Sequence, residues 1–103
     1  MTTIALYAEF SATPGNESTV QGLLGALAVE VRAELGNLVF DPHLLPAAAG
    51  FYVYEVYRNE AAFAAHLASD HCAAFNLALG PLVAGGGSRL TMLTPIDPVP
   101  QSK

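Results

Sequence analysis

Charged side chains are scarce in this sequence, and basic ones are the scarcest. Of its 103 residues, 13% are charged and 52% are hydrophobic, and the charged share is about half of that in a typical globular protein. Four Lys or Arg stand against nine Asp or Glu, which gives a formal net charge of −5. Nucleic acid binding requires clustered positive charge, so we exclude nucleic acid as a partner. So few charges cannot cover the whole surface of a monomer, which predicts self-association.

Cysteine and long apolar runs are also nearly missing. The single cysteine, Cys72, excludes an internal disulfide and a cysteine-rich metal site, and we interpret it as a small buried side chain. No apolar run approaches the roughly 20 residues that span a bilayer. The first ten residues, MTTIALYAEF, lack the basic residues that open a signal peptide. We therefore expect a soluble, cytoplasmic protein with no membrane partner.

Four segments have the composition of β-strands. They are rich in β-branched and aromatic residues, and turn residues such as those of Pro14-Gly15 bound them. The predicted strands are residues 3–10, 37–44, 51–58 and 89–95.

The first predicted helix runs from an N-cap at Asn16 to Gly36, because apolar residues, ending with Leu35, recur along one of its faces. Gly22 and Gly25 lie inside it, and each costs up to about 1 kcal/mol relative to alanine. Close approach to a neighbouring element would explain both glycines.

Helix-forming residues also fill segments 60–68 and 71–80. Ser69 or Asp70 is placed to cap the second segment, so we predict a helix that is broken between the two.

The resulting order is βαββαβ, which predicts an α+β ferredoxin-like fold with an antiparallel sheet and helices on one face. We expect one domain over residues 1–96 and a flexible, proline-rich tail over 97–103. Both faces of the third strand are apolar, yet the helices can cover only one face of the sheet. A second copy that packs on the uncovered face, or a sheet that wraps round a cavity, would bury the rest. Both together predict a homodimer, built as a dimeric α+β barrel with a pocket in each half.

The stretch FYVYEVYRNEAAFAAHLASDH, residues 51–71, brings Glu55, His66 and His71 close together in sequence. An imidazole is the best-matched base at neutral pH, because its unperturbed pKa is about 6.5. Glu55 could orient a histidine, or act as the base if burial raised its pKa. In the alternative interpretation, Glu55 pairs with an arginine or with the partner chain, and His71 lies exposed in the first turn of a helix. The remaining histidine, His43, is interpreted as a surface residue.

The spacing of the two histidines limits these roles. Five residues correspond to about 140° round a continuous helix, so the side chains would point apart unless the helix break reorients one of them. A zinc site would prefer histidines four residues apart and a third ligand nearby. The sequence therefore predicts no metal site.

Three motifs occur in order along the chain: GNLVFD at 36–41, FYVYEVY at 51–57 and the histidine segment AHLASDH at 65–71. With them, the chain resembles the antibiotic biosynthesis monooxygenase domain family over about residues 3–95. These are small dimeric ferredoxin-like barrels that include cofactor-free quinol monooxygenases. The first two motifs look most like the branch that isomerises the phosphorylated autoinducer-2 signal, and the third is shared with the quinol monooxygenases.

The resemblance implies a cofactor-independent monooxygenase that deprotonates a small quinol-like or polyketide-like aromatic and lets it react directly with O2. An isomerase or tautomerase of a small hydroxy-ketone, phosphorylated or not, is the first alternative. A non-catalytic dimer that binds a small molecule is the second. The acidic composition weighs mildly against a phosphorylated ligand.

The resemblance implies catalytic roles for Glu55, His66 and His71 and no cofactor. The expected substrate-binding residues are Asn37, Phe40, Tyr52, Tyr54 and Tyr57. Haem-degrading members carry an Asn, a Trp and a haem-ligating His where this sequence has Ala8, His66 and Asn76, so we exclude haem degradation.

Overall fold

The computed structural model describes residues 2–46 and 50–97. Its strands are β1 (Ile4–Ser11), β2 (Asn37–Leu44), β3 (Gly50–Tyr57) and β4 (Arg89–Leu93). Its helices are α1 (Glu17–Arg32), α2 (Glu60–Leu67) and α3 (Asp70–Leu79), and short 3-10 turns follow at Gly80–Leu82 and Ala84–Gly86. The predicted βαββαβ order is confirmed. In this described part, no helix combines the length and the apolar character that a membrane crossing requires.

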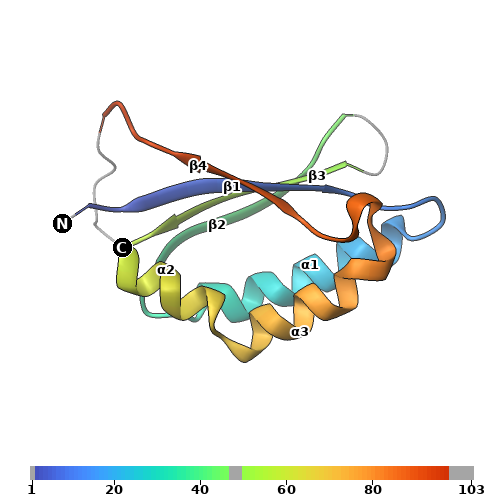
Figure 1. Ribbon diagram of the computed structural model, residues 1–103, viewed down its shortest axis with the longest axis horizontal. Coiled ribbons are helices and arrows are strands. Elements are labelled where there is room, and N and C mark those ends of the chain that lie inside the picture. The colour runs from blue at the N-terminus through green and yellow to red at the C-terminus, as the bar shows by residue number, and fades with distance from the viewer. Residues whose placement is uncertain (1, 47–49, 98–103) are drawn as a thin grey trace.

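The sheet has the order β2-β3-β1-β4, and every neighbouring pair is antiparallel. In the described part of the chain, the helices lie together on one face of this sheet (Figure 1). This is the predicted ferredoxin-like α+β arrangement. The register places Leu6 of β1 opposite Glu55 of β3, at the centre of the sheet.

The core fills the space between the sheet and α1. Val20, Leu24 and Val31 of α1 are buried there with Phe10 and Phe51 of the sheet. Their spacing along the helix puts them on one face. Apolar periodicity therefore predicted the packed face of this helix correctly.

The predicted end of this helix was wrong. α1 ends at Arg32, and the backbone N–H groups of Ala33 and Glu34 bond to carbonyls three residues earlier, which tightens the last turn. The chain then turns away from the helix axis, and Leu35 is 91% exposed instead of buried. This turn carries Glu34 toward α2.

Close approach occurs at a different glycine from those predicted. A Cβ added at Gly22 or Gly25 would meet no heavy atom within 4 Å. The close-approach explanation for these two is therefore wrong. At Gly36, in contrast, a Cβ would overlap the side chain of Ala62. Gly36 thus lets α2 pack directly against the turn after α1.

The predicted break between the second and third helices is confirmed. Ser69 is the N-cap of α3, and its hydroxyl accepts a hydrogen bond from the Cys72 N–H at 3.2 Å. The same hydroxyl donates to the backbone carbonyl of His66 at 2.6 Å. The break changes the chain direction between the two histidine-bearing helices (Figure 1).

Tyrosines lie on the sheet face that is turned away from the helices. Tyr7 of β1 and Tyr52 of β3 stack there with ring centroids 4.9 Å apart. Tyr54 shares this face, because side chains alternate along a strand. Apart from Asp97, the tail predicted at 97–103 lies outside the described residues.

Candidate active site

A cavity lies between the sheet and the helices. Its wall is mostly apolar, and its polar side chains are Glu55, His66, Cys72, Asn76 and Ser88. The strands contribute the floor, and α1, α2 and α3 contribute the rest of the wall. An apolar pocket with a few convergent polar groups is the usual form of a small-molecule site.

The cavity is small, at about 70 Å³. A dry cavity that accepts benzene has about 150 Å³, so a ring-sized ligand requires side chains of the wall to move. Leu67 is half exposed and Phe75 is only partly buried, and both line the cavity. Leu90, another residue of the cavity wall, is 45% exposed.

Glu55 lies at the centre of β3 and points into the cavity. Its side chain is on the helix-facing side of the strand together with Val53 and Tyr57, and the residue is only 5% exposed. The Tyr57 hydroxyl donates a hydrogen bond to Oε1 of Glu55 at 2.7 Å. Burial raises the pKa of Glu55, and this hydrogen bond and the nearby His66 offset part of the rise. The same burial and the Glu55 charge raise the pKa of Tyr57, so its hydroxyl stays protonated.

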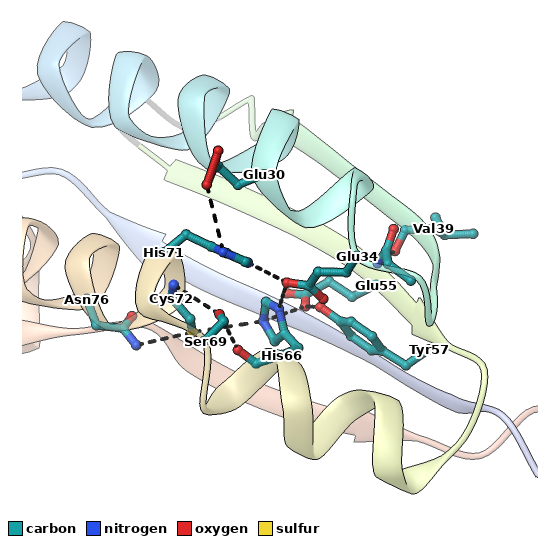
Figure 2. Close-up of polar contacts among 11 residues, drawn as sticks. Glu30, Glu34, Val39, Glu55, Tyr57, His66, Ser69, His71, Cys72 and Asn76 are labelled. Atoms are coloured by element: carbon teal, nitrogen blue, oxygen red, sulfur yellow. Dashed lines mark hydrogen bonds and ion pairs between the residues drawn. The ribbon is translucent and has the colours of Figure 1, made fainter.

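His66 is a buried histidine with a carboxylate on either side (Figure 2). Its Nδ1 is 2.9 Å from Oε2 of Glu34. Because a carboxylate only accepts hydrogen bonds, Nδ1 of the neutral ring donates and the lone pair is on Nε2. Nε2 lies 3.9 Å from Oε1 of Glu55 and 4.0 Å from Sγ of Cys72. The unprotonated nitrogen therefore faces the other polar groups of the cavity wall.

His71 contacts the same Glu34 carboxylate from α3. Its Nε2 is 2.5 Å from Oε2 of Glu34, and its Nδ1 is 3.8 Å from Oε2 of Glu30. His71 does not belong to the cavity wall and lies instead in a shallow groove with residues of α1 and α3. The structure thus brings the two histidines to one carboxylate, but only His66 to the cavity.

Sequence reasoning missed Glu34. The only local signal is its position four residues after Glu30, which places both acids on one side of a helix. Its contact with His66 depends on the turn after α1 and on the packing of Gly36 against α2. Neither feature follows from sequence spacing.

Cys72 is buried, as interpreted from the sequence, and it also lines the cavity. Burial raises the pKa of its thiol, and the carboxylates of Glu55 and Glu34 raise it further. The side-chain amide of Asn76 lies 3.7 Å from Sγ. Cys72 is therefore a protonated thiol next to His66.

The expected substrate-binding residues divide into two groups. Phe40 lines the cavity, and Tyr57 acts on it indirectly through Glu55. Asn37 is buried at the start of β2, where its amide donates to the backbone carbonyl of Val39 at 2.9 Å.

Tyr52 and Tyr54 do not reach this cavity. They alternate with Val53 and Glu55 along β3 and therefore point to the opposite face of the sheet. Counting positions along the strand from Glu55 could have excluded both. The pocket lies between the sheet and the chain's own helices, not on the sheet face expected to meet a second copy.

The arginines of the described residues lie elsewhere. Arg32 donates to the backbone carbonyl of Phe40, Arg58 donates to that of Leu35, and Arg89 pairs with Glu9 at 3.4 Å. In residues 2–46 and 50–97, therefore, Glu55 has no arginine partner and no arginine lines the cavity. The described cavity wall therefore offers no arginine side chain to a phosphate group.

Comparison with known proteins assigns the family. The model of the antibiotic biosynthesis monooxygenase (ABM) family matches residues 3–77. The chain belongs to the ABM family. The matched segment contains the four residues of the ionisable cluster, Glu34, Glu55, His66 and His71. Ala8, His66 and Asn76, the positions at which haem-site residues were expected from the resemblance, all line the cavity of this ABM protein.

Solved structures share the fold of this chain. Rv0793 from Mycobacterium tuberculosis is 27% identical, with a TM-score of 0.86 over 93% of this chain and 97% of that one. PA3566 from Pseudomonas aeruginosa is 28% identical, with a TM-score of 0.86 over 94% and 97%. A structure named antibiotic biosynthesis monooxygenase has 17% identity and a TM-score of 0.83 over 91% and 99%, which shows the fold alone. No curated protein matches this ABM chain.

Proposed function

We propose that this ABM protein is a cofactor-independent monooxygenase that oxidises a small quinol-like or polyketide-like aromatic. One observation carries the proposal. Glu34 accepts a hydrogen bond from Nδ1 of His66, so the lone pair of Nε2 lies beside Glu55 and the Cys72 thiol at the wall of an apolar cavity. A general base in a dry pocket is what such a reaction requires from the protein.

The chemistry begins with a proton transfer. A phenolic or enolic hydroxyl gives its proton to Nε2 of His66, and the carboxylate of Glu34 stabilises the resulting imidazolium. The anion that remains is electron-rich enough to reduce O2. In hydroquinone oxygenation, one oxygen atom enters the ring and the other leaves as water. The ring, now a hydroxyquinone, supplies all of the electrons, so no external reductant is needed.

The neighbouring residues have separate roles. Glu34 is a positioning residue, because it contacts His66 and does not line the cavity. Glu55, held by the Tyr57 hydroxyl, is placed to hydrogen-bond a substrate oxygen. The rings of Phe40, Phe63 and Phe75 border the cavity and would orient an aromatic substrate.

We further propose that the protein acts as a homodimer. The scarcity of charge and the tyrosine-bearing sheet face support this assembly. The pocket itself lies within one chain, so each copy would hold its own complete set of ionisable groups.

Oxygen uptake tests the proposed reaction. Chelator-treated protein is mixed with a panel of hydroquinones and anthrone-like phenols, and O2 consumption is recorded with an electrode. The wild type should exceed the uncatalysed rate, and His66→Gln should reduce the rate by about 10²–10⁴-fold, the usual contribution of a general base. His43→Gln is the control, because His43 does not line the cavity. Since His43 lies beside Tyr52 on the face proposed to meet a second copy, sedimentation verifies that this variant assembles as the wild type does.

Two outcomes would count against the proposal. Equal rates for His66→Gln and His43→Gln would show that His66 is not the base. No O2 uptake with any compound of the panel would contradict the proposed reaction. Solvent deuterium exchange into a hydroxy-ketone without O2 consumption would redirect the site to tautomerisation, which uses the same base.

A further inference from the structure

A cluster of donor atoms lies behind His66, on the side away from the cavity. Figure 2 shows Glu34, from the turn after α1, in contact with His66 of α2 and His71 of α3. Nδ1 of His66 and Nε2 of His71 approach one oxygen, Oε2 of Glu34, at 2.9 and 2.5 Å. All three side chains are at least three-quarters buried, with exposures of 7, 16 and 22% for His66, Glu34 and His71.

The arrangement matches the donor set of a transition-metal site. The ligand atoms of the three residues all lie within 4.8 Å of one another. Around a tetrahedral zinc ion with bonds of about 2.0 Å, neighbouring ligand atoms are roughly 3.3 Å apart. Small side-chain rotations therefore suffice to bring two imidazoles and one carboxylate onto a single ion.

Each histidine also has a second carboxylate at its remote nitrogen. Glu30 lies 3.8 Å from Nδ1 of His71, and Glu55 lies 3.9 Å from Nε2 of His66. Metal-binding histidines usually give their other ring N–H to a carboxylate, which fixes the tautomer. When one nitrogen of each ring binds the ion, the other nitrogen carries the proton. Each of these protonated nitrogens has a carboxylate oxygen within 4 Å.

We propose that Glu34, His66 and His71 form a binding site for one divalent transition-metal ion, and that its occupation withdraws His66 from base catalysis. Two imidazoles and one carboxylate suit Zn²⁺ and Co²⁺ more than Mg²⁺ or Ca²⁺. When Nδ1 of His66 binds the ion, the single proton of the neutral ring moves to Nε2. The lone pair that faces the cavity is then lost. The binding step stands independently, and only its effect on turnover rests on the proposed function.

The sequence argued against a metal for two reasons, and the structure removes both. The five-residue spacing of the histidines matters only on a continuous helix, and the break at Ser69 lets both reach one point. The missing third ligand is Glu34, which is distant in sequence from both.

Cobalt binding tests the site directly. Chelator-treated wild type is titrated with Co²⁺, and its visible ligand-field absorption is followed, with Zn²⁺ as competitor. We expect one ion per chain. His71→Ala should weaken binding by more than about 100-fold and Glu30→Gln by about 10-fold, the lower end for an outer carboxylate. Because the His71 side chain is partly exposed, its loss should leave the fold intact, which circular dichroism verifies.

The control is His43→Ala, which removes an exposed histidine outside the cluster. It should bind Co²⁺ as the wild type does. Absence of a Co²⁺ spectrum, or equal affinity for wild type and His71→Ala, would overturn the site.

The tautomer change is tested without turnover. In ¹⁵N NMR, His66 should carry its proton on Nδ1 in the metal-free protein and on Nε2 after one equivalent of Zn²⁺. A proton that stays on Nδ1 would overturn the switch. If oxygenase activity is found, Zn²⁺ should abolish it in the wild type, while any turnover of His71→Ala should resist the same Zn²⁺ concentration. If no activity is found on any substrate, the proposed reaction fails while the spectrum and the NMR signals still decide the site.

Discussion

At the residue scale, the most informative feature is a buried histidine whose two nitrogens have different surroundings. Nδ1 of His66 contacts Glu34, and Nε2 faces Glu55 and Cys72 at the cavity. A carboxylate on one nitrogen fixes which nitrogen is basic, as in catalytic triads. The role that we propose for His66 therefore depends on Glu34, a residue that does not line the cavity.

Glu34→Gln tests this dependence. The amide lacks the negative charge that stabilises an imidazolium, and its NH2 group can select the wrong tautomer. We expect kcat to fall by about 100-fold or more, with little change in KM. Steady-state kinetics on the best substrate of the panel measures both. A rise in KM with unchanged kcat would show that Glu34 only shapes the pocket.

Tyr57→Phe tests the support of Glu55. The change leaves a buried carboxylate without its 2.7 Å donor, so unfolding free energy should fall by about 1–3 kcal/mol in urea titrations. The pKa of Glu55 should rise further, because the lost bond favours its ionised form. Tyr52→Phe is the control, since it removes a hydroxyl from the opposite sheet face. Equal stability of the two variants would contradict this role of Tyr57.

At the element scale, the packing of α1 and α2 decides where the ionisable groups meet. α1 ends at Arg32, the following turn carries Glu34, and Gly36 allows α2 to lie directly against that turn. The close contact between Gly36 and Ala62 therefore supports the pairing of Glu34 with His66.

Gly36→Ala should disturb this contact. Its added methyl group overlaps the side chain of Ala62 and approaches the Ala62 Cα to 3.3 Å, so stability should fall by about 1–3 kcal/mol. Ala62→Gly in the same chain removes the overlapping atom and should recover part of the loss. Thermal and urea denaturation of both single variants and the double variant measure the coupling. Strictly additive effects would contradict a direct contact.

Gly22→Ala and Gly25→Ala should have the opposite sign. Both positions are exposed in α1, and an added Cβ meets nothing within 4 Å. Each substitution should therefore stabilise the protein by up to about 1 kcal/mol through helix propensity. Urea denaturation checks this. Destabilisation by either would indicate a contact that this single chain does not contain, such as one with a second copy.

At the scale of the whole molecule, the chain is rich in apolar residues, and the helices of its described part cover only one face of the sheet (Figure 1). Tyr7, Tyr52 and Tyr54 lie on the other face. With 13% charged residues, the chain has little material to solvate that face. Burial against a second copy is the assembly that we expect.

Tyr54→Lys tests the assembly. A lysine placed on the tyrosine-bearing face would be desolvated in a dimer, so the variant should sediment as a monomer where the wild type sediments as a dimer. Val29→Lys is the control, because Val29 is 69% exposed on α1, on the helix side. A wild type that is monomeric at every concentration in analytical ultracentrifugation would contradict the prediction.

Local patterns were sufficient for much of this fold. The spacing of apolar residues, the caps and the turn residues predicted the element order, the break at Ser69 and the buried face of α1. These features depend on interactions within a few residues, which sequence spacing records. The alternation of side chains along β3 also places Tyr52 and Tyr54 on the face opposite Glu55. The sequence therefore held this information, although both tyrosines were expected in the pocket.

The three-dimensional packing alone decided the site. α1 is shorter than predicted, and Glu34 contacts His66 across a separation of 32 residues. His71, which was expected in the cavity, contacts the same Glu34 carboxylate. These contacts join segments that are remote in sequence, and they depend on turn geometry and on the close fit at Gly36. Sequence periodicity does not predict the contacts of Glu34 with His66 and His71. They result from how the folded elements pack together and not from the conformational preference of any single element.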